Sequence, residues 1–250
     1  MDRESRGASS FGRPAPRLSA ATFALLSMLL LGACGREESM ACGAQAYANA
    51  VRDAAQETSA DVSTSLWAIA PANPRLAWTA DQSAVRMVTW TSWNGYTMGD
   101  ITLSQDVWLT AVPQLKELCQ GLPPAEIVAR VNQILGMPPA SEADAGRYFV
   151  ELWVRPADMF RPCPDAEIDD ARCDLTFPAT ATAEHRAWMN ANYAASYGSW
   201  QATKYPWTGL GYTYDWCNPS TKVGASEFVV RAGATVTVAG LVERDAYCAP

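Results

Sequence analysis

The first 33 residues constrain the fold most strongly, because they indicate that the chain leaves the cytosol and folds without them. Four arginines precede a mostly apolar run over residues 18–31, and the small residues Gly32 and Ala33 come directly before Cys34. A positive head, a short apolar core and small residues at the cleavage point are the features of a secretory signal peptide. The apolar run is also shorter than the roughly 20 residues that a membrane-spanning helix needs.

The sequence Leu31-Gly32-Ala33-Cys34 resembles the lipobox of bacterial lipoproteins. In that class the cysteine sulfur is lipidated and the cysteine becomes the new N-terminus, so the resemblance implies that Cys34 carries the lipid. It also implies a protein anchored in the cell envelope. Because Gly35 rather than Asp follows the cysteine, the resemblance implies the outer membrane, facing the periplasm, if the cell is Gram-negative. The resemblance covers about the first 35 residues and implies nothing about the remainder.

Removal of the signal segment makes the chain more acidic. Residues 1–33 hold four arginines and two acidic residues, so 15 basic and 24 acidic residues remain and the net charge becomes −9. An acidic surface is repelled by anionic headgroups and by nucleic acid. We therefore expect attachment to the membrane through the N-terminal lipid, no nucleic-acid partner, and an unidentified ligand or protein of the envelope as the partner.

Six cysteines remain after Cys34, and an even number in an exported chain favours disulfide bonds. The short spacing between Cys163 and Cys173 predicts a local bond. Cys42 and Cys248 lie near the two ends of the mature chain, and domain termini are often neighbours, which predicts a second bond. This leaves Cys119 to pair with Cys217. A metal site is disfavoured, because the chain has no Cys-x2-Cys pair and only one histidine.

The mature chain is expected to consist of a lipidated cysteine with a short tether over residues 34–41 and one globular domain over residues 42–250. Helical and strand patterns do not alternate strictly, which favours an α+β domain with a mainly antiparallel sheet and three to four helices. Asn94-Gly95 is a strong hairpin-turn signal. The expected strands are 85–93, 96–103, 106–112, 147–155, 207–216, 227–231 and 235–241, and the expected helices are 44–57, 113–120, 124–135 and 182–196.

The motifs for nucleophilic, nucleotide and metal chemistry are missing from the sequence, so no cofactor is expected. A triad needs a base beside its nucleophile, and the only histidine, His185, is expected to be exposed or to lie at a helix cap. No phosphate-binding glycine motif is present. One acidic loop has alternating carboxylates but lacks the glycine and glutamate of a calcium-binding EF-hand loop, so it is expected to be a solvated loop. Its acids are Asp165, Glu167, Asp169 and Asp170.

A glycan hydrolase needs two carboxylates in an aromatic cleft. Glu151 is the best candidate for one of them, because it shares a predicted strand face with Phe149, Trp153 and Arg155. Asp158 and Asp215 are weaker candidates for the partner acid. The alternative is an ordinary ion pair between Glu151 and Arg155 on a half-exposed sheet face.

Aromatic residues are abundant, and all ten tryptophans lie after residue 34. The alternating residues Tyr212, Tyr214 and Trp216, together with Trp153, are candidates for a ligand-binding platform on which sugar rings stack. The alternative is that these rings fill the core, where each buries about 150–250 Å².

These observations favour a lipid-anchored envelope protein with a binding or structural role and no enzymatic activity. Two alternatives stay open. One is a carbohydrate- or peptidoglycan-binding module that uses the aromatic strand face. The other is a carboxylate-dependent glycan hydrolase.

Overall fold

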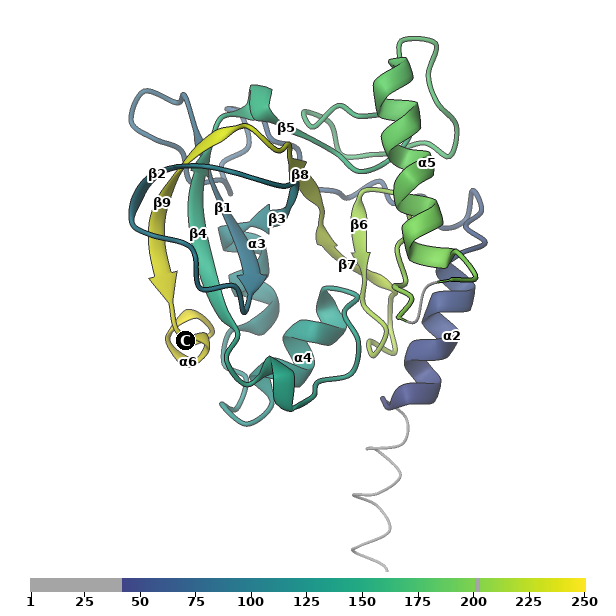
Figure 1. Cartoon of the computed structure of the whole chain (residues 1–250), viewed down its shortest axis with the longest axis horizontal. Coiled ribbons are helices and arrows are strands. Elements are labelled where there is room, and N and C mark those ends of the chain that lie inside the picture. Colours follow the sequence, from purple (N-terminus) through teal and green to yellow (C-terminus); the bar gives the residue numbers. More distant parts are fainter. Residues whose placement is uncertain (1–41, 201–202) are drawn as a thin grey trace, which may run out of the picture. The chain divides into compact units, whose positions relative to one another are not determined.

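A seven-stranded antiparallel sheet organises the fold, with the strand order β2-β9-β4-β1-β3-β8-β5 (Figure 1). The computed structural model describes residues 42–200 and 203–250. The expected signal segment, Cys34 and the tether to residue 41 lie outside the described residues. The sheet strands are β1 (Val85–Thr91), β2 (Gly99–Thr102), β3 (Val107–Ala111), β4 (Tyr148–Val154), β5 (Met159–Phe160), β8 (Phe228–Val230) and β9 (Thr235–Val242).

A separate two-stranded sheet pairs β6 (Tyr212–Tyr214) with β7 (Val223–Ser226). The described residues also form five α-helices: α2 (Ala44–Ala54), α3 (Val112–Cys119), α4 (Ile127–Ile134), α5 (Ala183–Tyr197) and α6 (Arg244–Tyr247). The predicted α+β class and the mainly antiparallel sheet are thus confirmed. No helix among the described residues is long and apolar enough to cross a bilayer.

Strand β4 lies near the middle of the sheet and has the clearest strand pattern. It pairs with β1 at seven consecutive positions, from Val85 opposite Val154 to Thr91 opposite Tyr148. Side chains alternate between the two faces of a strand, and Leu152 accordingly packs with Met87 in one core while Phe149 faces the other core. Both faces of the central strands are therefore buried.

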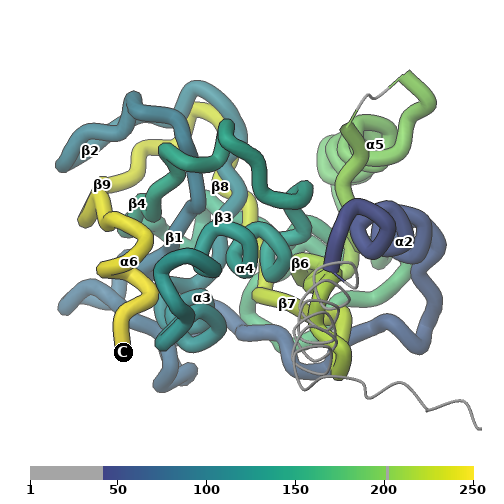
Figure 2. The backbone as a smooth tube through the Cα atoms, turned by 90° about the horizontal axis from the view of Figure 1, so that it is seen from below, coloured from purple at the N-terminus to yellow at the C-terminus, as the bar shows by residue number. Residues whose placement is uncertain are grey.

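Helices α3, α4 and α6 cover one face of the sheet (Figure 2). The predicted apolar face of α4 is buried, and Val131 and Ile134 have no exposed surface. They pack with Leu115 of α3 and with Phe149, whose ring stacks on Tyr247 at a centroid distance of 4.0 Å. Gly136 ends α4 with a φ of +66°, a conformation that glycine adopts without steric cost.

Helices α2 and α5 lie beyond the β6–β7 pair, with α5 above α2 in Figure 1 (Figures 1 and 2). Thr182 caps α5 as predicted, because its side chain accepts a hydrogen bond from the His185 amide. The expectation that His185 is exposed or capping is wrong, since it retains 3% exposure and its Nε2 lies 2.7 Å from the Cys163 carbonyl oxygen. Its ring fills space beside Phe160 and Trp188.

The hairpin predicted at Asn94-Gly95 is not formed. Residues 92–98 form a loop, and β2 pairs with β9 at the far edge of the sheet rather than with β1. The neighbours of β1 are β3 and β4, so no edge is left for a return strand. The loop is held instead by Tyr96, which is buried, and by the Tyr148 hydroxyl, which donates to the Trp93 carbonyl over 2.7 Å.

The strand predicted over residues 207–216 is also too long. Only Tyr212–Tyr214 forms a strand, Trp207 makes a single isolated bridge to Thr213, and Gly209 and Gly211 have φ values of +62° and +75°. These positive values turn the chain before β6 begins.

Three disulfides connect the described cysteines. Cys163 is joined to Cys173, as the short spacing predicts. The other two predicted pairings are wrong, because Cys42 is joined to Cys217 and Cys119 to Cys248. The reason is topological: α2 packs beside the β6–β7 pair, whereas α6 follows β9 and lies against α3 and α4. The two chain ends are therefore fastened to different parts of the domain.

Arg161 organises the acidic loop that follows β5. It is fully buried, and its guanidinium donates to four backbone carbonyl oxygens, those of Trp67, Glu167, Ile168 and Asp170. Burial lowers its pKa to about 10, so the group remains charged at neutral pH. The loop thus turns its carbonyl groups inward onto one cation.

The observed disulfide connectivity predicts the outcome of peptide mapping. Digestion without reduction should release a peptide pair joined through Cys119 and Cys248 and none joining Cys42 to Cys248. Replacing Cys119 and Cys248 by Ser should lower the free energy of unfolding by about 2–5 kcal/mol, because the bond closes a long loop. A crosslink between Cys42 and Cys248 would contradict the structure.

Candidate functional site

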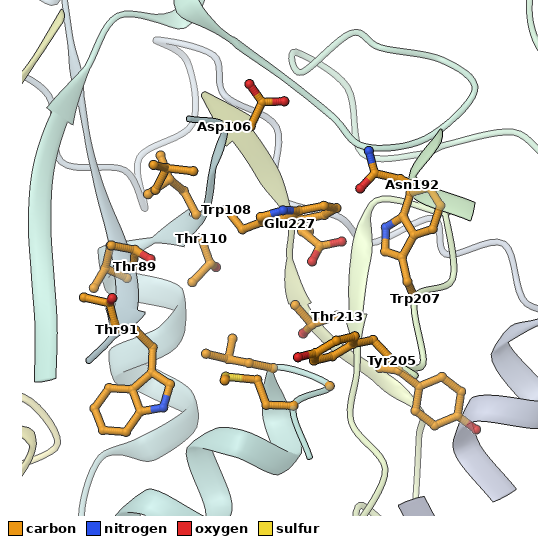
Figure 3. A pocket seen from close by; sticks show the side chains of 18 of the residues that line it. Thr89, Thr91, Asp106, Trp108, Thr110, Asn192, Tyr205, Trp207, Thr213 and Glu227 are labelled. Carbon is orange, nitrogen blue, oxygen red and sulfur yellow. The ribbon is translucent and has the colours of Figure 1, made fainter. Parts of the chain in front are cut away.

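A cavity of about 570 Å³ lies between the main sheet and the segment that leads into β6 (Figure 3). Its size falls in the range of pockets that hold small organic ligands, about 300–1,000 Å³. Strands β1 and β3 form one wall, and α5, residues 203–207 and β6 form the opposite wall. The loop after α4, over Leu135–Met137, contributes a third side.

The cavity exists because β1 and β3 separate early. These antiparallel strands pair only at Met87 opposite Ala111 and Val88 opposite Thr110, whereas β1 and β4 pair at seven positions. Beyond Val88 the two strands diverge, and β3 continues alongside β8 instead. Residues 89–91 of β1 and 107–110 of β3 then line the open space.

Aromatic rings form much of the cavity wall. Trp108 from β3 and Trp207 from the opposite segment meet edge to face, with ring centroids 6.2 Å apart. Trp188 of α5 packs behind both rings. Trp93 and Tyr205 also line the cavity, and they are 55% and 45% exposed. The wall therefore offers flat apolar surfaces to a bound molecule from its depth to its mouth.

Three buried polar atoms around this cavity have no hydrogen-bond partner among the residues that the structure describes. They are Thr110 Oγ1, Trp207 Nε1 and Glu227 Oε2 (Figure 3). A buried polar group without a partner costs about 1–3 kcal/mol. Such groups are rare in folded proteins, and here three of them share one cavity. Together they provide a hydroxyl, an N–H donor and a carboxyl group.

Glu227 is the most unusual of the three. It directly precedes β8, and its backbone N–H donates to the Gly211 carbonyl over 2.9 Å, which fixes its position. Burial raises the pKa of its carboxyl group to about 8. The Trp207 indole N–H lies near enough to lower that pKa in part, although its geometry falls short of a hydrogen bond.

The cavity lining carries acidic groups and no basic ones. Among the described lining residues, Glu227 and Asp106 are the only carboxylic acids, and none is Lys, Arg or His. Asp106 already accepts hydrogen bonds from the Trp188 indole over 2.7 Å and from the Ala232 amide over 2.8 Å. It joins α5 to the sheet and adds negative charge beside the opening.

The acids proposed from the sequence do not line this cavity. Glu151 is buried and forms an ion pair with Arg86 on the neighbouring strand, not with Arg155. Asp158 pairs with Arg155 over 2.7 Å. Asp215 is also buried, with both carboxylate oxygens bound by Arg130 over 2.7 and 2.5 Å. Each of the three carboxylates is neutralised by a different arginine.

The proposed aromatic platform is mostly buried. Tyr212 has no exposed surface and Trp216 retains 7%. The Trp216 indole donates to the Met137 carbonyl over 2.9 Å, and Tyr47 of α2 packs against it edge to face. Tyr214 is half-buried and donates to Asp53. Trp153 lies on another strand, with the Arg86 guanidinium over its ring. The four rings therefore do not form one exposed surface, although Tyr212 and Tyr214 line the cavity and Trp216 and Trp153 do not.

A second polar cluster surrounds Lys222, just before β7. Its ammonium nitrogen lies 2.8 Å from Asp53, 3.2 Å from Glu57 and 2.8 Å from Asp61. Burial raises the pKa of Glu57 to about 7, whereas Lys222 and hydrogen bonds from Thr58 hold the pKa of Asp61 well below its usual range. This cluster ties α2 and the loop after it to β7.

Sequence reasoning missed Glu227 and the tryptophans around it. The available signal was a single acid inside the apolar run Ala225-Ser226-Glu227-Phe228-Val229-Val230. An acid that interrupts a buried strand needs a partner or a ligand.

No family model, curated protein or solved structure was found that matches this chain. The site is therefore interpreted from its own geometry.

The buried pair of Asp215 and Arg130 predicts a loss of stability. Asp215→Asn should lower the free energy of unfolding by about 2–4 kcal/mol, somewhat less than a fully buried pair because Arg130 is partly exposed. The control, Asp158→Asn, breaks an ion pair whose arginine is largely exposed and should cost about 0–1 kcal/mol. Urea unfolding measures both variants, and equal effects would contradict the assignment.

The buried carboxyl groups predict how stability depends on pH. Glu227 and Glu57 have folded-state pKa values of about 8 and about 7, both raised above the ordinary value of 4.5. At a pH between 4.5 and the folded-state pKa of each group, the carboxyl group has lost its proton in the unfolded chain and keeps it in the folded chain. Each group should therefore lower stability as pH rises, by up to about 1.4 kcal/mol per pH unit.

Glu227→Gln should remove the contribution of Glu227 to the fall of stability with pH, which continues up to about pH 8. Glu57→Gln should remove the contribution of Glu57, which ends near pH 7. Urea unfolding between pH 5 and 9 gives the two profiles. A wild-type slope that persists unchanged in both variants would overturn this account.

Proposed function

We propose that this chain is a lipid-anchored protein of the cell envelope whose domain binds a small organic ligand in the aromatic cavity. The lipobox resemblance at Cys34 supports the anchoring and the export. The six cysteines of the mature chain, all in disulfides, agree with folding outside the cytosol.

The observation that carries the binding role is the group of three unpartnered polar atoms in one aromatic cavity. A ligand with its own polar groups satisfies them, while its apolar surface packs on Trp108 and Trp207. Ligand pockets typically have this composition, with apolar walls and a few convergent polar groups. The cost of burying those groups without partners is then recovered on binding.

The same cavity favours binding over catalysis. Its described lining holds no cysteine, histidine or lysine to act as a nucleophile or base. The acids proposed for a glycan hydrolase lie elsewhere, each in its own ion pair. The aromatic platform is mostly buried and only Tyr212 and Tyr214 of it line the cavity, so a carbohydrate-binding role would have to use the cavity.

Closing the mouth of the cavity tests the proposal. The full-length chain is titrated by calorimetry with 2-naphthylmethanol, a neutral probe with an aromatic body and one hydroxyl. Ala195→Trp places an indole at the cavity, because Ala195 lies on α5 and lines it with exposed surface. This variant should weaken binding about tenfold or more, which corresponds to about 1.4 kcal/mol.

Ala187→Trp is the matched control, since Ala187 is exposed on the same helix, two turns away, and does not line the cavity. It should leave the affinity within about twofold of the wild type. Equal affinity of both variants, or no binding of the probe to the wild type, would contradict the proposed function.

A further inference from the structure

We infer that the cavity selects ligands that carry a cationic nitrogen, with that nitrogen placed against the Glu227 carboxylate and among the tryptophan rings. This inference rests on the proposed function and names the chemical class of its ligand. The ligand would be an organic amine or a quaternary ammonium compound with an apolar body.

The distribution of charge around the cavity is the first argument. The described lining contains two acidic side chains, Glu227 and Asp106, and no basic side chain. Burial raises the pKa values of the lining tyrosines Tyr96, Tyr212 and Tyr214, so these side chains stay neutral at physiological pH. The lining therefore offers an anion no positively charged side chain, whereas a cation meets attraction from Asp106 and, once its carboxyl group has ionised, from Glu227.

The aromatic walls are the second argument. A cation within about 6 Å of a ring centroid is attracted by the negative face of the ring, and tryptophan gives the strongest attraction. Trp108 and Trp207 meet edge to face at the cavity, and the Glu227 carboxyl group lies beside both rings in the view of Figure 3. A positively charged group in this space contacts rings and carboxylate together.

The unpartnered carboxyl group is the third argument. Glu227 Oε2 is buried and has no partner, and no described cation lies within ion-pair distance of the group. The buried guanidinium of Arg161 lies over the ring of the neighbouring residue Phe228 and is bonded to backbone carbonyls. A cationic ligand would supply the missing counter-ion.

Ionisation of Glu227 couples this binding to pH. Its pKa is raised to about 8 by burial, so below that pH a cationic ligand must displace a proton from the carboxyl group. The other titratable groups that line the cavity are Asp106, from the loop before β3, and the tyrosines Tyr96, Tyr205, Tyr212 and Tyr214. Affinity for a cation should therefore rise with pH up to about 8 and stay level above it.

The test compares three probes with the same aromatic body and different charge, each titrated into the full-length chain. They are 2-naphthylmethanol, trimethyl(2-naphthylmethyl)ammonium and 2-naphthylmethanesulfonate. At pH 8 we expect the ammonium probe to bind about tenfold or more tightly than the alcohol, and the sulfonate to bind more weakly than both.

Glu227→Gln keeps the size of the side chain and removes its charge. It should weaken binding of the ammonium probe about tenfold and leave that of the alcohol within about twofold. The matched control is Glu117→Gln, which removes an exposed acid on α3 away from the cavity and should change neither affinity. Equal losses in both variants would mean that overall charge, not Glu227, attracts the probe, and would overturn the inference.

A measurement on the wild type keeps the inference testable if the variant fails to fold. Calorimetry at pH 7.5 in two buffers of different ionisation enthalpy should show release of about half a proton with the ammonium probe, because a tenfold preference for the ionised carboxyl group lowers its pKa by about one unit, and none with the alcohol. Binding of the alcohol without preference for the ammonium probe would refute the inference and leave the proposed function standing. Binding of neither probe would refute both.

Discussion

The early separation of β1 from β3 determines most of the architecture around the cavity. Two residue pairs join these strands before they diverge, so the sheet is continuous at one end and open at the other. Beyond this point β3 pairs with β8 instead of β1. Glu227, the residue directly before β8, therefore lies at the opening between β1 and β3. The carboxyl group therefore lies in the cavity as a consequence of strand pairing, not of a flexible loop.

The opposite wall of the cavity is held in place by several hydrogen bonds and ion pairs, each of which contributes little free energy by itself. The Thr213 hydroxyl donates to the Ile134 carbonyl over 2.6 Å and accepts from the Ala225 amide over 2.8 Å. Trp216 donates a hydrogen bond to Met137, in the loop that follows α4. Lys222 binds three carboxylates at the end of α2 and in the loop after it. A cavity with two fixed walls is pre-organised, so little of the binding free energy is spent on ordering it.

Local features of the fold could be predicted from the sequence, because local patterns determine them. The alternation in β4, the apolar face of α4 and the Thr182 cap all depend on residues within a few positions of one another. The hairpin predicted at Asn94-Gly95 is wrong because β2 pairs with β9, which is distant in the sequence. The pairing of Cys119 with Cys248 likewise depends on where α6 packs, which no local spacing reveals. The same holds for the candidate site, since Glu227, Trp108 and Trp207 come from separate segments that only the tertiary structure brings together.

The two long-range disulfides also determine how the domain bears mechanical load. Cys42 stands at the N-terminal end of the described chain and is bonded to Cys217, three residues after β6. A pulling force applied to the chain on the N-terminal side of Cys42 is therefore transmitted through the disulfide to Cys217, close to the β6–β7 pair. Helix α2 cannot separate from the β6–β7 pair before this bond breaks. The C-terminal end is clamped separately, through Cys248 and Cys119 on α3. Tension on a tethered N-terminus would thus act on the cavity wall that contains β6, and not on the core of the seven-stranded sheet.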